Sequence, residues 1–154
     1  MKKELWLGLV CIGWVGGAMG APQTCLSQMD ASFVSPAAAV VKGPFSLGGR
    51  ACQEGLGFRG PASLFLLRGE AVFFAGKVGV QDGAKGTLAF EIRCTFDDRV
   101  LWSSGPMQAG DAPKPFKVYL KYSPEFELRT LGDAGCQGDW VETALVMERT
   151  YPAA

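Results

Sequence analysis

The sequence contains no histidine and no asparagine, and these absences exclude several kinds of chemistry. Without histidine the chain cannot build a serine–histidine–aspartate triad, a histidine general base or a histidine-ligated metal site. Its 15 basic and 15 acidic residues cancel, so no strong positive field attracts nucleic acid or anionic lipid. We therefore expect a protein that has no nucleic-acid partner and lacks the commonest hydrolytic machinery.

The composition is that of a globular protein. Hydrophobic residues make up 48% of the chain and charged residues only 19%, whereas a disordered chain has few apolar residues and a large net charge. The length of 154 residues suits one domain of the usual size. We therefore expect a single domain with a buried core.

The first twenty residues have the pattern of a secretory signal. Lys2 and Lys3 precede an apolar run over residues 5–17, and Ala18-Met19-Gly20 supplies small residues for cleavage. The run is short of the roughly 20 apolar residues that span a bilayer. We expect residues 1–20 to be a cleaved signal peptide and residues 21–154 a secreted domain without a membrane span, periplasmic or extracellular and monomeric.

Four cysteines remain after that cleavage: Cys25, Cys52, Cys94 and Cys136. An even number of cysteines outside the cytosol predicts disulfides, although the sequence leaves three pairings open. Our working pairs are the two local ones, Cys25 with Cys52 and Cys94 with Cys136. Each would stabilise the fold by on the order of 3–4 kcal/mol in the chain-entropy model.

Apolar, aromatic and β-branched residues recur in short runs separated by Gly, Pro and Asp, which is typical of antiparallel β-structure. The clearest run alternates, with Leu88, Phe90, Ile92, Cys94 and Phe96 on the predicted buried side. Residues 105–115 predict a long connection, because their prolines and glycines interrupt a ladder. The predicted strands are 64–67, 72–80, 88–96, 100–103, 116–121, 126–131 and 140–147, with an edge strand at 37–41. The residues thus predict an all-β sandwich or barrel.

A series of short motifs gives the chain a family resemblance. In order, they are Gly55-Leu56-Gly57-Phe58, Val78-Gly79-Val80, Phe90-Glu91-Ile92, Leu101-Trp102-Ser103-Ser104-Gly105, Gly110-Asp111-Ala112-Pro113-Lys114, Phe126-Glu127-Leu128, Asp133 and Trp140. Their order and spacing, over residues 25–148, resemble the NPCBM family of carbohydrate-binding modules. The resemblance implies a galactose-binding-like jelly-roll β-sandwich that is noncatalytic and accompanies secreted glycosidases.

The chain departs from the family pattern at polar positions. Arg59 stands where the family usually carries histidine, and Gln81 stands in the usual place of an aspartate. The loop over residues 135–140 is shortened and lacks an Asp-His pair. The apolar framework is unchanged, so these departures concern groups that orient ligand loops.

Sugar recognition requires an aromatic ring for the apolar face of a pyranose and polar groups for its hydroxyls. The predicted ligand-binding residues are Arg59, Trp102, Tyr119, Asp139 and Trp140. Tyr122 is a further candidate stacking ring, and the further loop candidates are Asp82, Asp111, Lys114 and Asp133. Trp102 and Trp140 have the alternative interpretation of core residues, because aromatic side chains dominate buried area. Tyr119 shares its strand side with lysines, which predicts exposure.

The sequence favours binding over catalysis. No residue is predicted to be catalytic, no cofactor is expected, and no pair of cysteines has the spacing of a zinc site; a structural calcium at the Asp133 loop is an alternative. The function we expect is that of a secreted, noncatalytic glycan-binding module. A cell-envelope sandwich that contacts proteins is the alternative, and a small hydrolase with paired carboxylates is a third hypothesis.

Overall fold

The computed structural model describes residues 23–24, 34–35 and 40–147. The predicted signal peptide, Cys25 and most of the predicted edge strand at residues 37–41 lie outside the described residues.

Within these ranges every regular element is a β-strand and all strand pairs are antiparallel. The strands are β1 (Gln23–Thr24), β2 (Val34–Ser35), β3 (Val40–Lys42), β4 (Phe45–Leu47), β5 (Arg50–Cys52), β6 (Gly55–Arg59), β7 (Ala62–Leu67), β8 (Ala71–Val80), β9 (Thr87–Cys94), β10 (Arg99–Gln108), β11 (Lys114–Tyr119), β12 (Glu125–Gly132) and β13 (Gln137–Met147). The all-β antiparallel prediction is confirmed.

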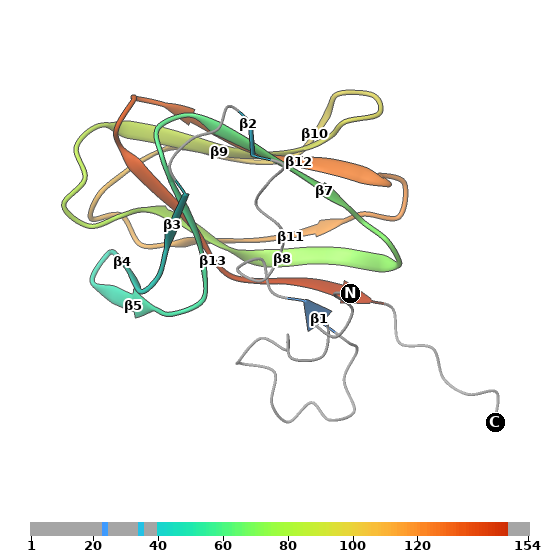
Figure 1. Ribbon diagram of the computed structural model, residues 1–154, viewed down its shortest axis with the longest axis horizontal. Helices are drawn as coiled ribbons and strands as arrows, with labels where there is room; N and C mark the ends of the chain where they lie inside the picture. Colours follow the sequence, from blue (N-terminus) through green and yellow to red (C-terminus); the bar gives the residue numbers. More distant parts are fainter. Residues whose placement is uncertain (1–22, 25–33, 36–39, 148–154) are drawn as a thin grey trace.

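Two sheets form the layers of a sandwich (Figure 1). Sheet A has the order β11-β8-β13-β6-β3, with β1 paired to β13, and sheet B has the order β10-β9-β12-β7-β2. Strands that are neighbours in space are mostly distant in sequence, as in a Greek-key sandwich. The sheet ends formed by Val80, Arg59 and Gln137 therefore meet at one end of the sandwich.

The core between the sheets is rich in aromatic rings. Trp140 makes edge contacts with Phe90 and Phe116, with ring centroids 5.6 and 5.7 Å apart. The alternation predicted around Phe90 is confirmed for Leu88, Phe90, Ile92 and Cys94, which are all buried. Phe96 departs from it with 83% exposure, because the chain has already entered the β9–β10 turn.

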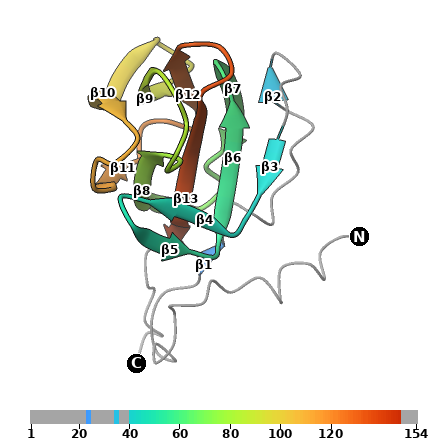
Figure 2. The same cartoon turned by 90° about the vertical axis from the view of Figure 1, so that its left-hand side faces the viewer.

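A short hairpin, β4–β5, crosses the outer face of sheet A (Figure 2). Phe45, Leu47 and Cys52 of this hairpin pack with Val141 of β13 in a second, smaller hydrophobic cluster. Burial on both faces makes this half of sheet A interior, which is why small residues such as Gly79 occur under the hairpin.

The prediction that residues 105–115 form a connection is wrong for residues 105–108. Strand β10 continues to Gln108 and pairs Pro106 with Ala89 of β9. The ladder accommodates the interruption through a register shift between Ser103 and Pro106. Proline is tolerated here because β10 is an edge strand, so one side of its backbone needs no partner.

The expected Cys94–Cys136 disulfide is wrong. Both side chains are buried free thiols. Gly132, shortly before Cys136, pairs with Leu88 at the start of β9. Cys94 lies six residues further along β9, so the two thiols are about 20 Å apart. A disulfide needs Cα atoms within about 7 Å. Cys52 is also a buried free thiol.

Candidate functional site

Three long polar side chains come together at one end of sheet A. Arg59 at the end of β6 pairs in register with Gln137 at the start of β13, and the backbone amide of Gln81 donates to the carbonyl oxygen of Gln137 at 3.0 Å. Arg59 is exposed, and the two glutamines are half-buried. We call Arg59, Gln137 and Gln81 the polar rim.

Asp139 lies in the next row of the sheet and is fully buried. Its cross-strand neighbours are Gly57 and Gly79, and a side chain at Gly57 would collide with its carboxylate. Phe45 and Leu47 of the hairpin lie against these glycines. The two glycines therefore leave the space in which a carboxyl group fits between the sheet and its hydrophobic cover.

The carboxyl group of Asp139 has one hydrogen-bond partner among the described residues. Its Oδ1 accepts from Nε2 of Gln137 at 2.9 Å, whereas Oδ2 is buried without a partner. Asp139 thus fixes the amide of Gln137 rather than reaching solvent itself. It is a positioning residue for the polar rim.

Burial raises the pKa of Asp139 to about 7, against a smaller lowering by the hydrogen bond from Gln137. A carboxyl group with such a pKa has the property of a general acid. Its side chain is sealed from solvent, however, and a general acid must come within hydrogen-bond reach of the proton it transfers. The pKa of Asp139 is therefore a consequence of packing.

Asp82 holds the hairpin over this site. Its carboxylate accepts from the Ser46 hydroxyl at 2.5 Å and from the amides of Gly48 and Gly49 at 2.8 and 2.9 Å. The hydrogen bond from Ser46, followed by those from the glycine amides, lowers the pKa of Asp82. Asp82, a loop candidate for ligand binding, thus uses its carboxylate to hold the hairpin in place.

We expect Asp82→Ala to loosen the β4–β5 hairpin without unfolding the sandwich, because it removes three hydrogen bonds that join the hairpin turn to β8. Amide hydrogen exchange at Gly48 and Gly49 should accelerate by about tenfold or more. Exchange in β9 serves as the control. Unchanged protection at the two glycines would contradict this role.

The structure packs the two predicted tryptophans in or against the hydrophobic core. Trp140 is fully buried, and its indole N–H donates to the hydroxyl of Thr130 at 3.2 Å. Trp102 is half-buried on β10, with its ring 5.3 Å from that of Phe116. The structure therefore supports the alternative interpretation, in which both tryptophans are core residues. Neither ring offers an open face at the polar rim.

Tyr119 is 50% exposed, as predicted, but it lies far from Arg59. It pairs with Phe73 on β8, and Gln81 of the polar rim lies eight residues further along the chain. At about 3.3 Å per residue this separates the two places by about 25 Å. The five predicted ligand-binding residues therefore do not form one site.

The remaining loop candidates have structural partners. Asp111 accepts from the amide of Gln108 and Asp133 from the amide of Thr87, both at 2.9 Å. The Lys114 ammonium donates to the carbonyl oxygen of Ser104 at 2.8 Å. In the part of the chain that the structure describes, no three acidic or cysteine side chains gather to hold a metal ion.

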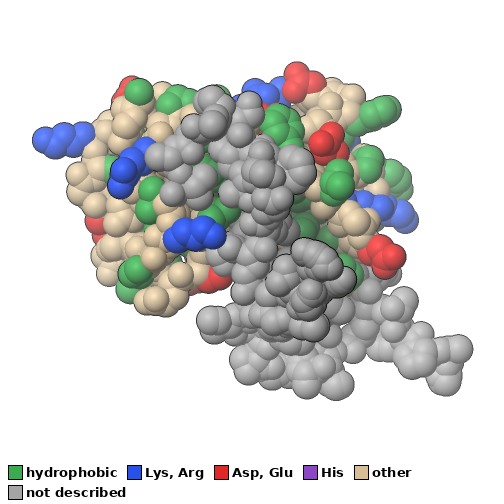
Figure 3. All heavy atoms as spheres, viewed as in Figure 1, with side chains coloured by type: hydrophobic (Ala, Val, Ile, Leu, Met, Phe, Trp, Pro, Cys, Tyr) green, Lys and Arg blue, Asp and Glu red, His purple; other side chains and the backbone are tan. Residues whose placement is uncertain are grey.

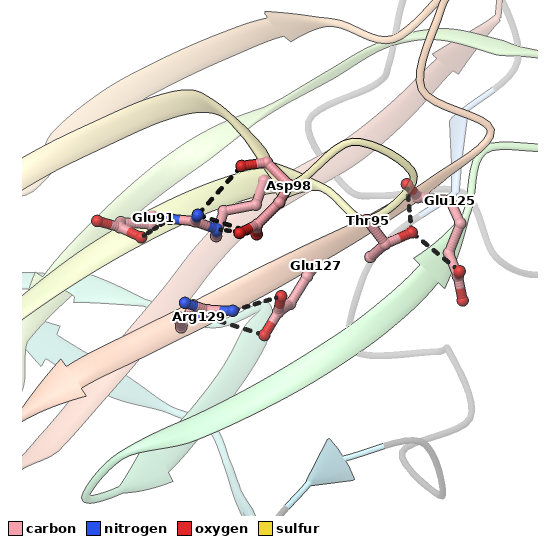
Figure 4. Close-up of polar contacts among 7 residues, drawn as sticks. Glu91, Thr95, Asp98, Glu125, Glu127 and Arg129 are labelled. Atoms are coloured by element: carbon pink, nitrogen blue, oxygen red, sulfur yellow. Dashed lines mark hydrogen bonds and ion pairs between the residues drawn. The ribbon is translucent and has the colours of Figure 1, made fainter.

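The outer face of sheet B carries a row of ion pairs (Figure 4). Arg129 binds both carboxylate oxygens of Glu127 at 3.0 Å, and Arg93 bridges Glu91 and Asp98 at 3.0 and 2.9 Å. Burial alone would raise the pKa of Glu127, but the hydrogen bonds from Arg129 and Ser63 leave it lowered. Each of these carboxylates forms an ion pair with an arginine. Arg59 of the polar rim forms no ion pair with the described residues.

Sequence reasoning named Arg59 but missed Gln137 as a site residue, and it noted Gln81 only as a departure from the family pattern. The signal that could have found them is that Arg59, Gln81 and the loop that contains Gln137 are all departures from the family pattern. Strand order was needed to bring them together, since Arg59 ends β6, Gln137 begins β13 and Gln81 follows β8.

The fold of this sandwich is like that of solved CBM51 modules. The chain belongs to the NPCBM/NEW2 domain family, whose model matches residues 24–146. The family resemblance and the sandwich fold predicted from the sequence are confirmed.

Solved structures support the fold assignment. The structure of the CBM51-2 and INT domains of Clostridium perfringens ZmpB matches with a TM-score of 0.71 at 16% identity, and the match covers 86% of this chain and 33% of that chain. The CBM51 of Clostridium perfringens GH95, solved in complex with methyl-galactose, matches with a TM-score of 0.67 at 19% identity. That match covers 80% of this chain and 99% of the other chain. At these identities the likeness concerns the fold.

One curated relative has a recognisable sequence similarity. Alpha-1,3-galactosidase B of Akkermansia muciniphila is 28% identical over 134 residues, which cover 82% of this chain and 16% of the relative. The chain therefore spans a small part of that protein. No helix among the described residues is long and apolar enough to cross a membrane.

Proposed function

We propose that this protein is a secreted, noncatalytic carbohydrate-binding module that binds glycans through the polar rim. Membership of a carbohydrate-binding module family supports glycan binding. We place the glycan-binding site at the polar rim because Arg59, Gln137 and Gln81 lie together at one end of sheet A.

The chemistry of the polar rim suits sugar hydroxyls. The Arg59 guanidinium offers donors in a planar fork, and an amide such as that of Gln137 both donates and accepts. Asp139 holds the Gln137 amide nitrogen, which leaves the amide oxygen to accept from a hydroxyl group. A pre-oriented amide loses less entropy on binding than a free one.

The neighbours suggest which sugars to test first. One CBM51 module of similar fold was solved with methyl-galactose and another with GlcNAc. The alternative function, a cell-envelope module that contacts proteins, has its support in exposed apolar side chains at Leu67 and Phe96, which are 73% and 83% exposed.

We expect Arg59→Ala and Gln137→Ala each to weaken glycan binding about tenfold or more, because each removes hydrogen bonds to the sugar. A glycan array that includes galactose- and GlcNAc-terminated glycans identifies the ligand, and isothermal titration calorimetry measures the affinities. The matched control is Lys85→Ala on the exposed β8–β9 loop, which should bind as the wild type does.

Silence of the folded wild-type protein across the whole array would contradict glycan binding and favour the protein-contact alternative. Binding that survives both rim substitutions would contradict the location. Thermal melts of each variant separate loss of binding from loss of fold.

A further inference from the structure

Three aromatic rings and two lysines form a continuous strip at the other end of sheet A. The Lys117 ammonium lies 4.5 Å from the Phe73 ring centroid, and the Phe73 and Tyr119 centroids are 5.5 Å apart. The Tyr119 and Tyr122 centroids are 6.4 Å apart, and the Lys121 ammonium lies 5.8 Å from the Tyr122 centroid. We call these five residues the aromatic–lysine strip.

The strip is open to solvent. Tyr119 is 50% exposed and Tyr122 is 70% exposed, and both lysines are exposed. Figure 3 shows hydrophobic, basic and acidic side chains at the right-hand end of the molecule, where Figure 1 places the β7–β8 turn and the connection after β11. Tyr119 and Tyr122 therefore present ring surface to the solvent.

The lysines of the strip have no carboxylate partner among the described residues. Of the lysines in sheet A, Lys77 pairs with Glu142 at 3.1 Å, whereas Lys117 and Lys121 contact aromatic rings. This contrasts with sheet B, where Arg93 and Arg129 are matched by acidic residues. Two positive charges at the ends of the strip are thus available to an anionic ligand.

The backbone under the strip is held in place. Lys117 and Tyr119 stand on β11, which pairs with β8 over its whole length. The following turn is fixed by hydrogen bonds from the Leu120 amide to the Val72 carbonyl oxygen at 2.7 Å and from the Ser123 amide to the Leu120 carbonyl oxygen at 2.9 Å. The backbone that carries the rings is therefore preorganised, which lowers the entropic cost of binding.

We propose that the aromatic–lysine strip is a second binding site, which takes an acidic polysaccharide. Pyranose rings stack on Tyr119 and Tyr122, and carboxylate or sulfate groups along the same chain pair with Lys117 and Lys121. Aromatic faces attract the apolar C–H face of a sugar, and the lysines supply charge complementarity. The site lies about 25 Å from the polar rim and is independent of it.

A glycan fits the strip better than an acidic protein segment does. The strip is built of rings and ammonium groups, which suit a pyranose ring and its acidic substituents. Neither Tyr119 nor Tyr122 donates a hydroxyl hydrogen bond to the described residues that would hold it for an internal role. Both tyrosine hydroxyls are therefore available for contact with hydroxyl groups of a sugar.

The test compares three polymers on the full-length protein by affinity gel electrophoresis and calorimetry: polygalacturonate, neutral dextran and poly-glutamate. We expect polygalacturonate to bind, with affinity that falls as salt rises, and the other two to bind at least about tenfold more weakly. The double variant Lys117→Gln/Lys121→Gln and the double variant Tyr119→Ala/Tyr122→Ala should each lose about tenfold or more.

Matched control variants show whether polygalacturonate binds at the aromatic–lysine strip. Lys85→Gln removes one charge from an exposed loop elsewhere and should leave binding unchanged, and Tyr119→Phe/Tyr122→Phe keeps the rings and should retain most of it. Arg59→Ala should also retain it, which separates this site from the polar rim. Poly-glutamate binding as tight as polygalacturonate binding, or equal loss in Lys85→Gln, would overturn the proposal, as would binding that survives removal of the tyrosine rings.

Discussion

Asp139→Asn is expected to make the protein more stable at pH 8 and to remove most of the decline in stability between pH 4 and pH 7. The pKa of Asp139 is about 7 in the folded protein and about 3.9 in an unfolded chain. Between those values the folded state holds a proton that the unfolded state has released. Stability therefore falls as pH rises, by about 1.4 kcal/mol per unit and by up to about 4 kcal/mol in total.

The measurement is urea unfolding at a series of pH values. Wild type and Asp139→Asn should agree near pH 4, where the carboxyl group is neutral in the folded state, and should diverge by roughly 2–4 kcal/mol at pH 8. Glu70→Gln is the control, because it removes a negative charge from an exposed turn. A pH profile of Asp139→Asn parallel to that of the wild type would contradict the assignment.

Trp140→Ala is expected to lower the free energy of unfolding by about 3–5 kcal/mol. The ring is fully buried and contacts Phe90 and Phe116, so its removal leaves a large cavity between the sheets. It also leaves the hydroxyl of Thr130 without its indole partner. Since domains are stable by about 5–15 kcal/mol, the variant should be marginally folded.

Trp140→Phe tests the same role with a smaller change and should cost less, because a ring still fills most of the space. Tyr119→Ala is the matched surface control, with an expected change within about 0.5 kcal/mol. If Trp140→Phe unfolded as the wild type does but lost glycan binding, the interpretation of Trp140 as a core residue would be wrong.

The fold was largely predictable because its signal is local. The alternation over Leu88, Phe90 and Ile92 reports a strand with one buried face, and the buried residues are the ones the alternation selects. The errors occur where tertiary context overrides a local signal. Pro106 predicts a break, yet an edge position and a bulge keep it in β10. The Cys94–Cys136 pair was chosen for closeness in sequence, which the sheet register does not preserve.

The candidate site was less predictable because it depends on strand order. Gln137 and Arg59 are far apart in sequence and become neighbours through the pairing of β6 with β13. The burial of Asp139 depends on the β4–β5 hairpin, whose Phe45 and Leu47 pack against the sheet, and no local pattern predicts that placement. Single residues such as Tyr119 were predictable in exposure but not in what surrounds them.

The irregular strand β10 has a consequence for how the molecule behaves in concentrated solution. Exposed sheet edges invite the edges of other molecules to pair with them, which is a common origin of aggregation. Here Pro106 lacks an amide proton, and the shift of register near Gly105 bends the ladder. Pairing of a second copy along β10 is therefore interrupted at Pro106, which disfavours the growth of fibrils across this border of the sandwich.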